Sequence, residues 1–532
     1  MCLAMAGVML AATSVAFAAP ASLPRIVEQN GRHALLVDGE PFLILGAQCH
    51  NSSAWPATLP AVWRELAYLN ANTLEAPVYW EQFEPEPGKF DPSMVDELID
   101  GARAHRLRLV LLWFGTWKNG SSHYLPLWMK DQPKRFPRML ARDGKPVDSP
   151  SPHSQELLQA DIHAFRALMR HLREKDPAQT VILVQVENEP GTWGGFVRDF
   201  SPAAEKLFAE TVPAELTAKL GVASGKNWRD TFGENADEFF HAWSVARFIG
   251  QVAAAGKAEY PLPLYVNAAL RDPLNPGPAT TYESGGATDN VLAIWKAAAP
   301  AIDVLAPDIY QFDPEKYLKV LDLYARPDNA LLVPETIGNS PFSRHFFDAL
   351  GHGAIGWAPF GVDHPQMTEA EWLTASRAPD YAHVGVARNF RLASSADRLL
   401  ARLNFEGKLH AVSEQPGKPQ QSLMVQRWDA KISYGVPPFG NRTEPKGNPQ
   451  PTGGAIIAEL GPDEFLVGGF FCRVDFVPHD LGRAQREYVR VEEVQLNDYA
   501  LQMLRIWNGD ETDWGLNFAG TPTWLHVKLG TF

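Results

Sequence analysis

The chain has 532 residues, of which 45% are hydrophobic and 21% charged, and its formal net charge at pH 7 is −14. It is too long for one compact core, so we expect a globular protein with two or three domains. The negative charge argues against a nucleic-acid partner, which would need a basic face, and favours a neutral or acidic small substrate.

The N-terminal segment has the features of an export signal. Residues 3–18 form an uncharged apolar run that ends in Ala16-Phe17-Ala18, a small-x-small cleavage pattern. The run is shorter than a typical membrane span, and no other stretch reaches that length. We therefore predict that residues 1–18 are a signal peptide and that the protein is periplasmic or secreted, with no membrane partner. A buried N-terminal helix is the alternative.

A β-hairpin is predicted next, with strands at 25–28 and 34–37 and a turn at Asn30-Gly31. Beyond it, apolar β-rich runs alternate with amphipathic helical stretches, a pattern typical of parallel strands joined by helical crossovers. The strand candidates are 42–48, 73–80, 107–117, 181–189, 264–269, 304–310, 331–337 and 354–360.

Helical periodicity separates these strand candidates. Apolar residues recur on one helical face at 95–102, 162–172 and 317–324, and Thr368-x-x-Glu371 is a capping-box pattern for a last helix. Eight strand–helix units predict an α/β fold, a (β/α)₈ TIM barrel. We assign residues 24–404 to this barrel, including the N-terminal hairpin.

From residue 405 onward, short β-like runs are separated by Gly, Pro and Asn turns. This texture predicts a β-rich, sandwich-like accessory domain at 405–532. Cys49 and Cys472 lie far apart in the sequence, and no Cys/His spacing resembles a metal site. We expect no disulfide framework, no metal and no organic cofactor.

Two strand ends carry unusual carboxylates, at the place where TIM barrels keep their active groups. The fourth strand candidate, VILVQVENEPG at 181–191, ends in Glu187-Asn188-Glu189, and the seventh, ALLVPETIG at 330–338, delivers Glu335. Because side chains alternate along a strand, Glu187 and Glu189 are expected on one face, with Glu189 nearer the rim. Glu187, which lies deeper, is expected to be a hydrogen-bonded structural carboxylate.

Two facing carboxylates are what glycoside hydrolysis requires, because one protonates the leaving oxygen while the other attacks the anomeric carbon. Either Glu189 or Glu335 alone is compatible with a structural ion pair. Both at strand ends favour catalysis, because a buried charge without compensation is destabilising. A retaining enzyme needs about 5–5.5 Å between the two groups, and the strand positions permit it.

At this point the chain resembles a known family. VQVENEPG at 184–191 closely resembles the VQVENEYG motif of glycoside hydrolase family 35, the β-galactosidases, and 72–91 resembles the family's second-strand segment. The positions that match in that segment are Val78, Trp80, Glu84, Pro85, Pro87 and Gly88. The resemblance spans about 40–360 and implies that Glu189 is the acid/base, Glu335 the nucleophile, and Asn188 a hydrogen-bond partner of the sugar 2-hydroxyl.

Three positions depart from the family's pattern. Pro77 stands where many members have Tyr, Pro190 also replaces a Tyr, and residues 114–119 replace a Cys-Ala-Glu-Trp run that contacts galactose. With these changes the chain resembles a divergent bacterial branch of the family, some of whose members resemble xyloglucan side-chain β-galactosidases. The resemblance therefore implies a retaining, exo-acting β-galactosidase that acts on oligo- or polysaccharides, with the identity of the sugar left open.

Further substrate-binding candidates lie near the strand ends. In clan A barrels a Tyr near the place of Tyr310 hydrogen-bonds the nucleophile, and Trp357 is a candidate platform beneath the −1 sugar, although both also suit a packing role. The remaining candidates are Trp193, for stacking on the leaving group, and Trp113, Trp117, Glu81 and His50.

Two other functions stay open. The first is another clan A enzyme with the same pair, such as a β-glucosidase, a β-mannosidase or an endo-hydrolase. The second is a non-catalytic carbohydrate-binding relative, which would be expected to lack one carboxylate. The C-terminal domain is expected to bind carbohydrate, to cap the barrel or to form the interface of a homodimer.

Overall fold

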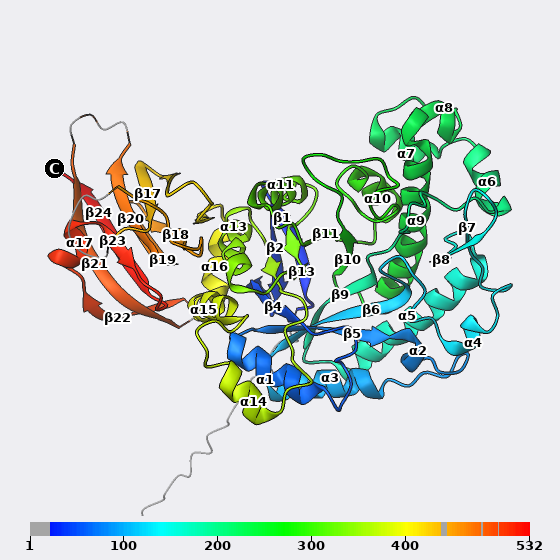
Figure 1. Cartoon of the computed structure of the whole chain (residues 1–532), viewed down its shortest axis with the longest axis horizontal. Coiled ribbons are helices and arrows are strands. Elements are labelled where there is room, and N and C mark those ends of the chain that lie inside the picture. Colours follow the sequence, from blue (N-terminus) through cyan, green and yellow to red (C-terminus); the bar gives the residue numbers. More distant parts are fainter. Residues whose placement is uncertain (1–21, 438–443, 480–481, 483, 498) are drawn as a thin grey trace, which may run out of the picture.

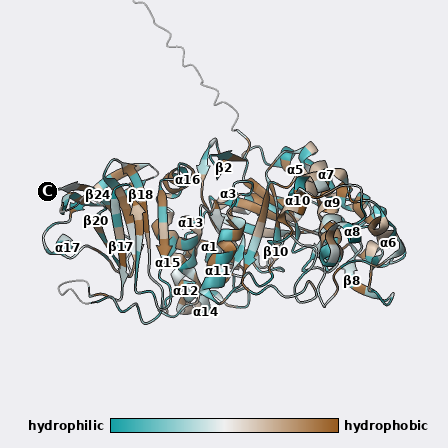
Figure 2. Ribbon diagram, turned by 90° about the horizontal axis from the view of Figure 1, so that it is seen from above, coloured by the Kyte–Doolittle hydropathy of each residue, from teal (hydrophilic) through white to brown (hydrophobic). Residues whose placement is uncertain are grey.

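The described part of the chain forms a barrel with two small accompanying sheets, and two antiparallel C-terminal sheets that lie at one end of the molecule (Figure 1). The computed structural model describes residues 22–437, 444–479, 482, 484–497 and 499–532, so the predicted signal peptide lies outside the described residues. Seen from above, the molecule is elongated (Figure 2). Within these ranges no helix has both the length and the apolar character needed to cross a membrane.

The predicted (β/α)₈ TIM barrel is confirmed, with eight parallel strands in a closed ring. Pro334 divides the seventh strand into β12 (Leu332–Val333), which pairs with the eighth strand, and β13 (Glu335–Thr336), which pairs with the sixth. Proline has no N–H to donate, so the ladder is interrupted there. The other barrel strands are β4 (Ile44–Gln48), β5 (Thr73–Tyr79), β6 (Arg108–Lys118), β9 (Val181–Asn188), β10 (Leu264–Ala269), β11 (Val304–Ile309) and β14 (Gly356–Trp357).

Helices surround the barrel because each can bury one apolar face against the strands. The periodicity at 95–102 corresponds to α3, whose predicted apolar residues are all buried, and the capping box of Thr368 and Glu371 begins α14. The helices of the barrel region are α1 (Leu59–Leu69), α2 (Trp80–Phe83), α3 (Ser93–Ala104), α4 (Leu127–Lys130), α5 (Gln155–Lys175), α6 (Pro202–Ala209), α7 (Ala214–Leu220), α8 (Trp228–Phe232), α9 (Ala236–Glu259), α10 (Leu292–Ala298), α11 (Pro314–Tyr324), α12 (Ser340–Ser343), α13 (His345–Gly351), α14 (Glu369–Ala375), α15 (Val384–Ala393) and α16 (Asp397–Phe405), with a 3₁₀ turn at Gly233–Asn235.

Two small sheets accompany the barrel. The predicted hairpin is present as β1 (Arg25–Gln29) and β2 (Arg32–Val37), and β3 (Glu40–Phe42) extends it to three strands. A second pair, β7 (Arg138–Leu140) and β8 (Pro146–Pro150), lies in the connection between the third and fourth barrel strands.

The C-terminal part forms the predicted β-rich structure as two antiparallel sheets. Six strands pair in the order β15-β18-β19-β24-β21-β22, and four pair in the order β16-β17-β20-β23. The elements are β15 (Leu409–Ser413), β16 (Gln420–Val425), β17 (Trp428–Tyr434), β18 (Gly454–Gly461), β19 (Glu464–Phe470), β20 (Cys472–Pro478), β21 (Arg486–Asn497), β22 (Ala500–Ile506), α17 (Asp510–Asp513), β23 (Leu516–Phe518) and β24 (Trp524–Thr531).

The six-stranded sheet is buried on both faces near the barrel. Consecutive residues of a strand point to opposite faces, and Ile457 of β18 packs in the core between the two sheets while Ile456 joins the core of the barrel. Helices α13, α15 and α16 lie between the barrel strands and this sheet (Figure 1). Trp524 of β24 donates its indole N–H to the carbonyl of Leu392 in α15 at 2.9 Å. The barrel and the sheet therefore share one hydrophobic core.

Candidate active site

Glu189 and Glu335 come together at the C-terminal mouth of the barrel, one directly after β9 and the other in β13. Oxygens of these two carboxyls and of Asp308 in β11 lie within 4.8 Å of one another. Glu189 is 8% exposed and Glu335 5%. Oxygens this close are compatible with the roughly 5–5.5 Å between the carboxyl groups of retaining glycosidases.

Glu335 accepts two hydrogen bonds. The hydroxyl of Tyr310 donates to Oε1 at 2.5 Å, and the side-chain amide of Gln48 donates to Oε2 at 3.2 Å. Such bonds stabilise the ionised form of a carboxyl group. Burial and the negative charge of Glu335 raise the pKa of Tyr310, so the phenol keeps its proton and remains a donor.

Glu189 has the properties of a proton donor. Burial, and then the negative charge of Glu335, raise its pKa to about 7. Its backbone N–H donates to Oδ1 of Asn267 in β10 at 2.9 Å, and its φ of +41° ends the extended strand. A carboxyl with this pKa holds its proton up to near-neutral pH, as a general acid must.

The expectation that Glu187 and Glu189 share one face is wrong. Glu187 has a φ of +65°, and the register of β6 against β9 shifts nearby, so the alternation of side chains breaks at this strand end. Its carboxyl accepts the backbone N–H of Trp117 at 2.6 Å and hydrogen-bonds Asp161 of α5. Burial and the charge of Asp161 raise the pKa of Glu187 well above its usual value, so Glu187 is a protonated structural group turned toward a helix.

Asn188 is oriented by a buried lysine. Lys118, at the end of β6, donates to the side-chain oxygens of Asn188 at 2.8 Å and of Asn119 at 2.5 Å. An ammonium group can only donate, so Nδ2 of Asn188 must face away from it. This nitrogen is buried and meets no acceptor among the described residues. A sugar hydroxyl would supply one, in keeping with the contact that the resemblance implies for Asn188.

Two more carboxyls lie beside the pair. Glu75 of β5, 3.5 Å from the hydroxyl of Tyr265, and Glu283, in the loop after β10, are both fully buried. Burial and the charge of Glu335 raise the pKa of Glu75 well above its usual value, and burial and the charge of Glu189 do the same for Glu283. The site therefore gathers further buried carboxyls whose raised pKa values favour their protonated forms.

The glycine-containing loop at 283–286 packs against the segment that follows Glu189. Thr192 and Ser284 exchange backbone hydrogen bonds of 2.8 and 3.1 Å. A Cβ on Gly191 would lie 2.4 Å from the carbonyl oxygen of Ser284, and its φ is +146°, so glycine is required there. This packing fixes the base of the loop that carries Trp193, which is 45% exposed and remains a candidate for stacking on the leaving group.

His50 and Glu81 are both held by other side chains. Nδ1 of His50 lies 3.1 Å from Oδ1 of Asp363, and this hydrogen bond raises the pKa of His50. Its ring is half-exposed and keeps Nε2 available for a further hydrogen bond. Glu81, in α2, forms an exposed ion pair with Lys130 at 3.1 Å, which competes with the predicted role as a hydroxyl ligand.

Trp113 and Trp117 are core residues, and their predicted contact with sugar is wrong. Both are fully buried. Trp113 donates its indole N–H to Asp161 at 2.9 Å, and Trp117 donates to the hydroxyl of Ser149 at 3.3 Å. Their rings pack between strand β6 and the helices outside the barrel, so neither has a free face for a sugar.

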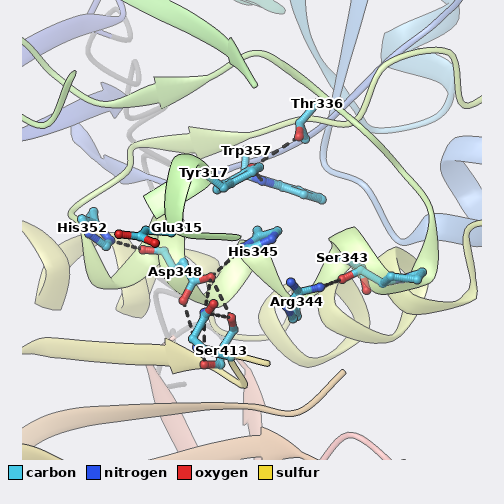
Figure 3. Close-up of polar contacts among 12 residues, drawn as sticks. Glu315, Tyr317, Thr336, Ser343, Arg344, His345, Asp348, His352, Trp357 and Ser413 are labelled. Atoms are coloured by element: carbon cyan, nitrogen blue, oxygen red, sulfur yellow. Dashed lines mark hydrogen bonds and ion pairs between the residues drawn. The ribbon is translucent and has the colours of Figure 1, made fainter. Parts of the chain in front are cut away.

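Trp357 is likewise 1% exposed, and its prediction as a sugar platform is wrong. It belongs to a buried contact network shown in Figure 3. Its indole N–H donates to the hydroxyl of Tyr317 at 3.1 Å, and that hydroxyl lies 3.3 Å from Oγ1 of Thr336, the neighbour of Glu335. The ring of Tyr317 stacks on His345 with centroids 3.9 Å apart.

The network continues into the C-terminal sheets. Nδ1 of His345 lies 2.8 Å from Oδ2 of the buried Asp348 in α13. The backbone N–H and the hydroxyl of Ser413 in β15 donate to Asp348 at 3.0 and 2.7 Å (Figure 3). Contacts thus run without interruption from the strand of Glu335 to the first strand of the six-stranded sheet.

Several residues of the site have no place in the sequence-based prediction. Their common signal is a polar side chain within or at the end of an otherwise apolar strand, in register with the barrel interior or its mouth. They are Gln48, Glu75, Lys118, Asn267 and Asp308.

Comparisons with known proteins give a match to one family model over part of the chain and similarities to solved structures. A family model described as a domain of unknown function, DUF5597, matches residues 386–519. No curated protein matches the sequence. Among solved structures, the β-galactosidase from Rahnella sp. R3 is similar at 14% identity with a TM-score of 0.49, covering 68% of this chain and 58% of that one.

Two other solved structures are similar to a comparable degree. The β-galactosidase from Bacillus circulans sp. alkalophilus is 13% identical, with a TM-score of 0.49 and coverage of 67% of this chain and 57% of that one. The catalytic domain of the β-amylase from Paenibacillus polymyxa is 11% identical, with a TM-score of 0.46 and coverage of 60% and 92%. The chain thus spans less than two thirds of the length of each β-galactosidase.

Proposed function

We propose that the chain is a retaining, exo-acting β-galactosidase that removes terminal β-galactosyl residues from oligo- or polysaccharides. The observation that carries the proposal is the pair at the barrel mouth: Glu335, hydrogen-bonded by two donors, and Glu189, with a raised pKa, within 4.8 Å of it. The galactosyl group and the exo mode rest on the resemblance of 184–191 and 72–91 to family 35.

The reaction is a double displacement. Ionised Glu335 attacks the anomeric carbon while Glu189 gives its proton to the leaving oxygen. The new ester bond removes the charge of Glu335, which is one cause of the raised pKa of Glu189, so Glu189 ionises more readily. Glu189 then takes a proton from the attacking water, and Glu335 is released as a carboxylate.

A panel of nitrophenyl β-glycosides tests the proposed substrate. We expect the galactoside to give the highest kcat/KM. Preference for a glucoside or mannoside would contradict galactose and support another glycosidase with the same pair. If the protein is stably folded and releases nitrophenol from none of the glycosides, the result would support a carbohydrate-binding protein without catalytic activity.

Azide rescue tests the roles of the two carboxyls. Glu335→Gly should abolish turnover, and azide should restore it by forming the α-glycosyl azide, because azide then attacks from the side left open by the missing nucleophile. Glu189→Ala with azide should give the β-anomer instead. Glu174→Gln, on the exposed side of α5, is the matched control and should stay near wild-type activity. Rescue products of the opposite configuration would reverse the assignment.

We also propose, from the apolar run at 3–18, that the protein is exported. N-terminal sequencing of the protein recovered from the periplasm or the medium should begin just after Ala18. Recovery of the unprocessed chain in the cytoplasm alone would contradict export.

A further inference from the structure

Asp308 is a third carboxyl in direct contact with the catalytic pair. It is the register partner of Glu335 across β11 and β13, and it is 2% exposed. Its Oδ2 accepts the side-chain N–H of Asn267 at 2.6 Å. Its Oδ1 is buried and receives no hydrogen bond from any N–H or O–H group that the structure describes. An ionised oxygen left in this state is strongly disfavoured.

Asn267 determines which oxygen of Asp308 is free. The backbone N–H of Glu189 can only donate, so Oδ1 of Asn267 faces Glu189 and Nδ2 faces Asp308. Oδ2 of Asp308 is thereby occupied as an acceptor, which leaves Oδ1, the oxygen without a partner, as the atom that can interact with the nearby carboxyl of Glu189. Two carboxyls can share a hydrogen bond only if one of them carries a proton.

We propose that Asp308 keeps its proton throughout the reaction and donates it as a hydrogen bond to Glu189, which makes Asp308 a positioning residue for the acid/base. This inference rests on the proposed function. When Glu189 has protonated the leaving oxygen, the O–H of Asp308 stabilises the resulting carboxylate. When water attacks, its proton goes to Glu189. The three carboxyls carry one negative charge at every stage, on Glu335 in the free enzyme and on Glu189 in the glycosyl-enzyme.

The electrostatic surroundings support this assignment. Burial is the largest cause that raises the pKa of Asp308 well above its usual range, and the charges of Glu335 and Glu189 act in the same direction. Lys118 acts in the opposite direction, and it lies at the end of β6 with its ammonium bound to two amide oxygens. Among the described residues, Tyr265, Tyr310 and Tyr324 also interact with Asp308, and burial raises the pKa of each phenol, which favours the neutral form.

Two substitutions separate a protonated Asp308 from an ionised one. Asp308→Asn keeps a neutral group with one acceptor and one donor, so kcat/KM should stay within about threefold and the alkaline limit of its pH profile should not move. Asp308→Ala removes the donor to ionised Glu189. The alkaline limit should rise by roughly one pH unit, and hydrolysis of the glycosyl-enzyme should slow roughly tenfold or more.

Asp308→Asn shows the opposite shift of the pH profile if Asp308 is ionised. An ionised Asp308 would raise the pKa of Glu189, so its removal in Asp308→Asn would lower the alkaline limit; a fall of about one pH unit would overturn the proposal. Asp322→Asn, on the exposed side of α11, is the control and should leave the profile unchanged.

An infrared difference spectrum tests the proton without any turnover. Wild type minus Asp308→Asn, recorded at neutral pH without substrate, should contain the C=O band of a protonated carboxyl. An ionised carboxylate band in its place would overturn the proposal. If wild type hydrolyses no glycoside, the proposed function fails, and the infrared spectrum still shows whether Asp308 is protonated.

Discussion

The burial that prepares Glu189 as a proton donor also destabilises the folded protein at neutral pH. The pKa of Glu189 is about 7 in the fold, against an ordinary value of 4.5, so the folded state binds this proton more tightly than the unfolded state. Stability is therefore lost as the pH rises from about 4.5 to about 7. At about 1.4 kcal/mol for each pH unit, the loss is about 3 kcal/mol.

Glu189→Gln should remove this dependence. We expect the variant and the wild type to differ little in stability below pH 4.5, and the variant to gain up to about 3 kcal/mol over the wild type by pH 8. Thermal unfolding at several pH values measures the difference. Glu215→Gln, on the solvent side of α7, is the matched control. A gap between Glu189→Gln and wild type that stays constant with pH would contradict the interpretation.

Tyr310→Phe should reduce kcat/KM by roughly tenfold to a hundredfold, because it removes the 2.5 Å hydrogen bond to Glu335. A hydrogen bond to a charged group is worth about 1.5–3 kcal/mol, and this one supports the nucleophile. Steady-state kinetics on the preferred aryl glycoside measures the loss. Because Tyr310 is 38% exposed, the melting temperature should change little. An unchanged kcat/KM would show that Gln48 alone is sufficient.

At this scale the sequence predicts the carboxylates better than the aromatic residues. Glu189 and Glu335 stand out because a charge at the end of an apolar strand requires an explanation, and the fold does bring them together. The predictions for Trp113, Trp117 and Trp357 are wrong because an indole ring can either stack on a sugar or pack in a core. Only the face of the strand on which the residue lies decides between these two roles. The predicted face of the strand is also wrong for Glu187, because its positive φ turns the side chain away from the face expected from strict alternation.

Helices and strands whose apolar residues recur with a regular period could be predicted from the sequence, whereas irregular strands could not. All eight barrel strands lie where the apolar runs place them, because parallel strands covered on both faces read as continuous apolar segments. Residues 470–476 form one β-like run in the sequence, but Phe471 adopts a φ of +49° and separates β19 from β20, which lie in different sheets. Strand β22 could not be predicted from alternating apolar and polar residues, because none of its residues is buried.

Ser413→Ala should destabilise the contact between α13 and β15. It removes the 2.7 Å hydrogen bond from the hydroxyl to Asp348, a buried carboxylate, and the expected loss of stability is about 1–3 kcal/mol. The melting temperature should fall, while activity well below the transition should remain near that of wild type. Ser422→Ala, on the exposed side of β16, should have no such effect. Equal melting temperatures for the two variants would show that Ser413 contributes nothing to the network.

At the scale of the whole molecule, the shared core predicts that the barrel depends on the C-terminal sheets. Ile456, Leu466, Phe470 and Trp524 are all part of the core that fills the barrel region. A chain that ends at residue 404 would expose the surface they cover. We expect it to be insoluble or strongly aggregating when expressed, as measured by size-exclusion chromatography, and a soluble, active barrel would contradict the prediction.

A point substitution tests the same dependence without deletion. Leu466→Asp places a charge in the shared core and should lower the melting temperature strongly, with a cost of several kcal/mol. Leu504→Asp, on the exposed strand β22, is the matched control and should melt like wild type. If both variants melt alike, the face of the six-stranded sheet toward the barrel is not structurally required.

The break of the seventh strand at Pro334 leaves both of its halves weakly paired to their neighbours. Each half-strand pairs over two residues only, as do β9 with β10 and β4 with β14, whereas β5 pairs with β6 over seven. Local opening of a β-barrel begins where the fewest ladder bonds must be broken. The amides of β12 and β13 should therefore exchange with solvent hydrogen faster than those of β5, although both are buried. The nucleophile of the proposed reaction thus lies in one of the weakly paired parts of the barrel, where small adjustments to a bound sugar break few ladder bonds.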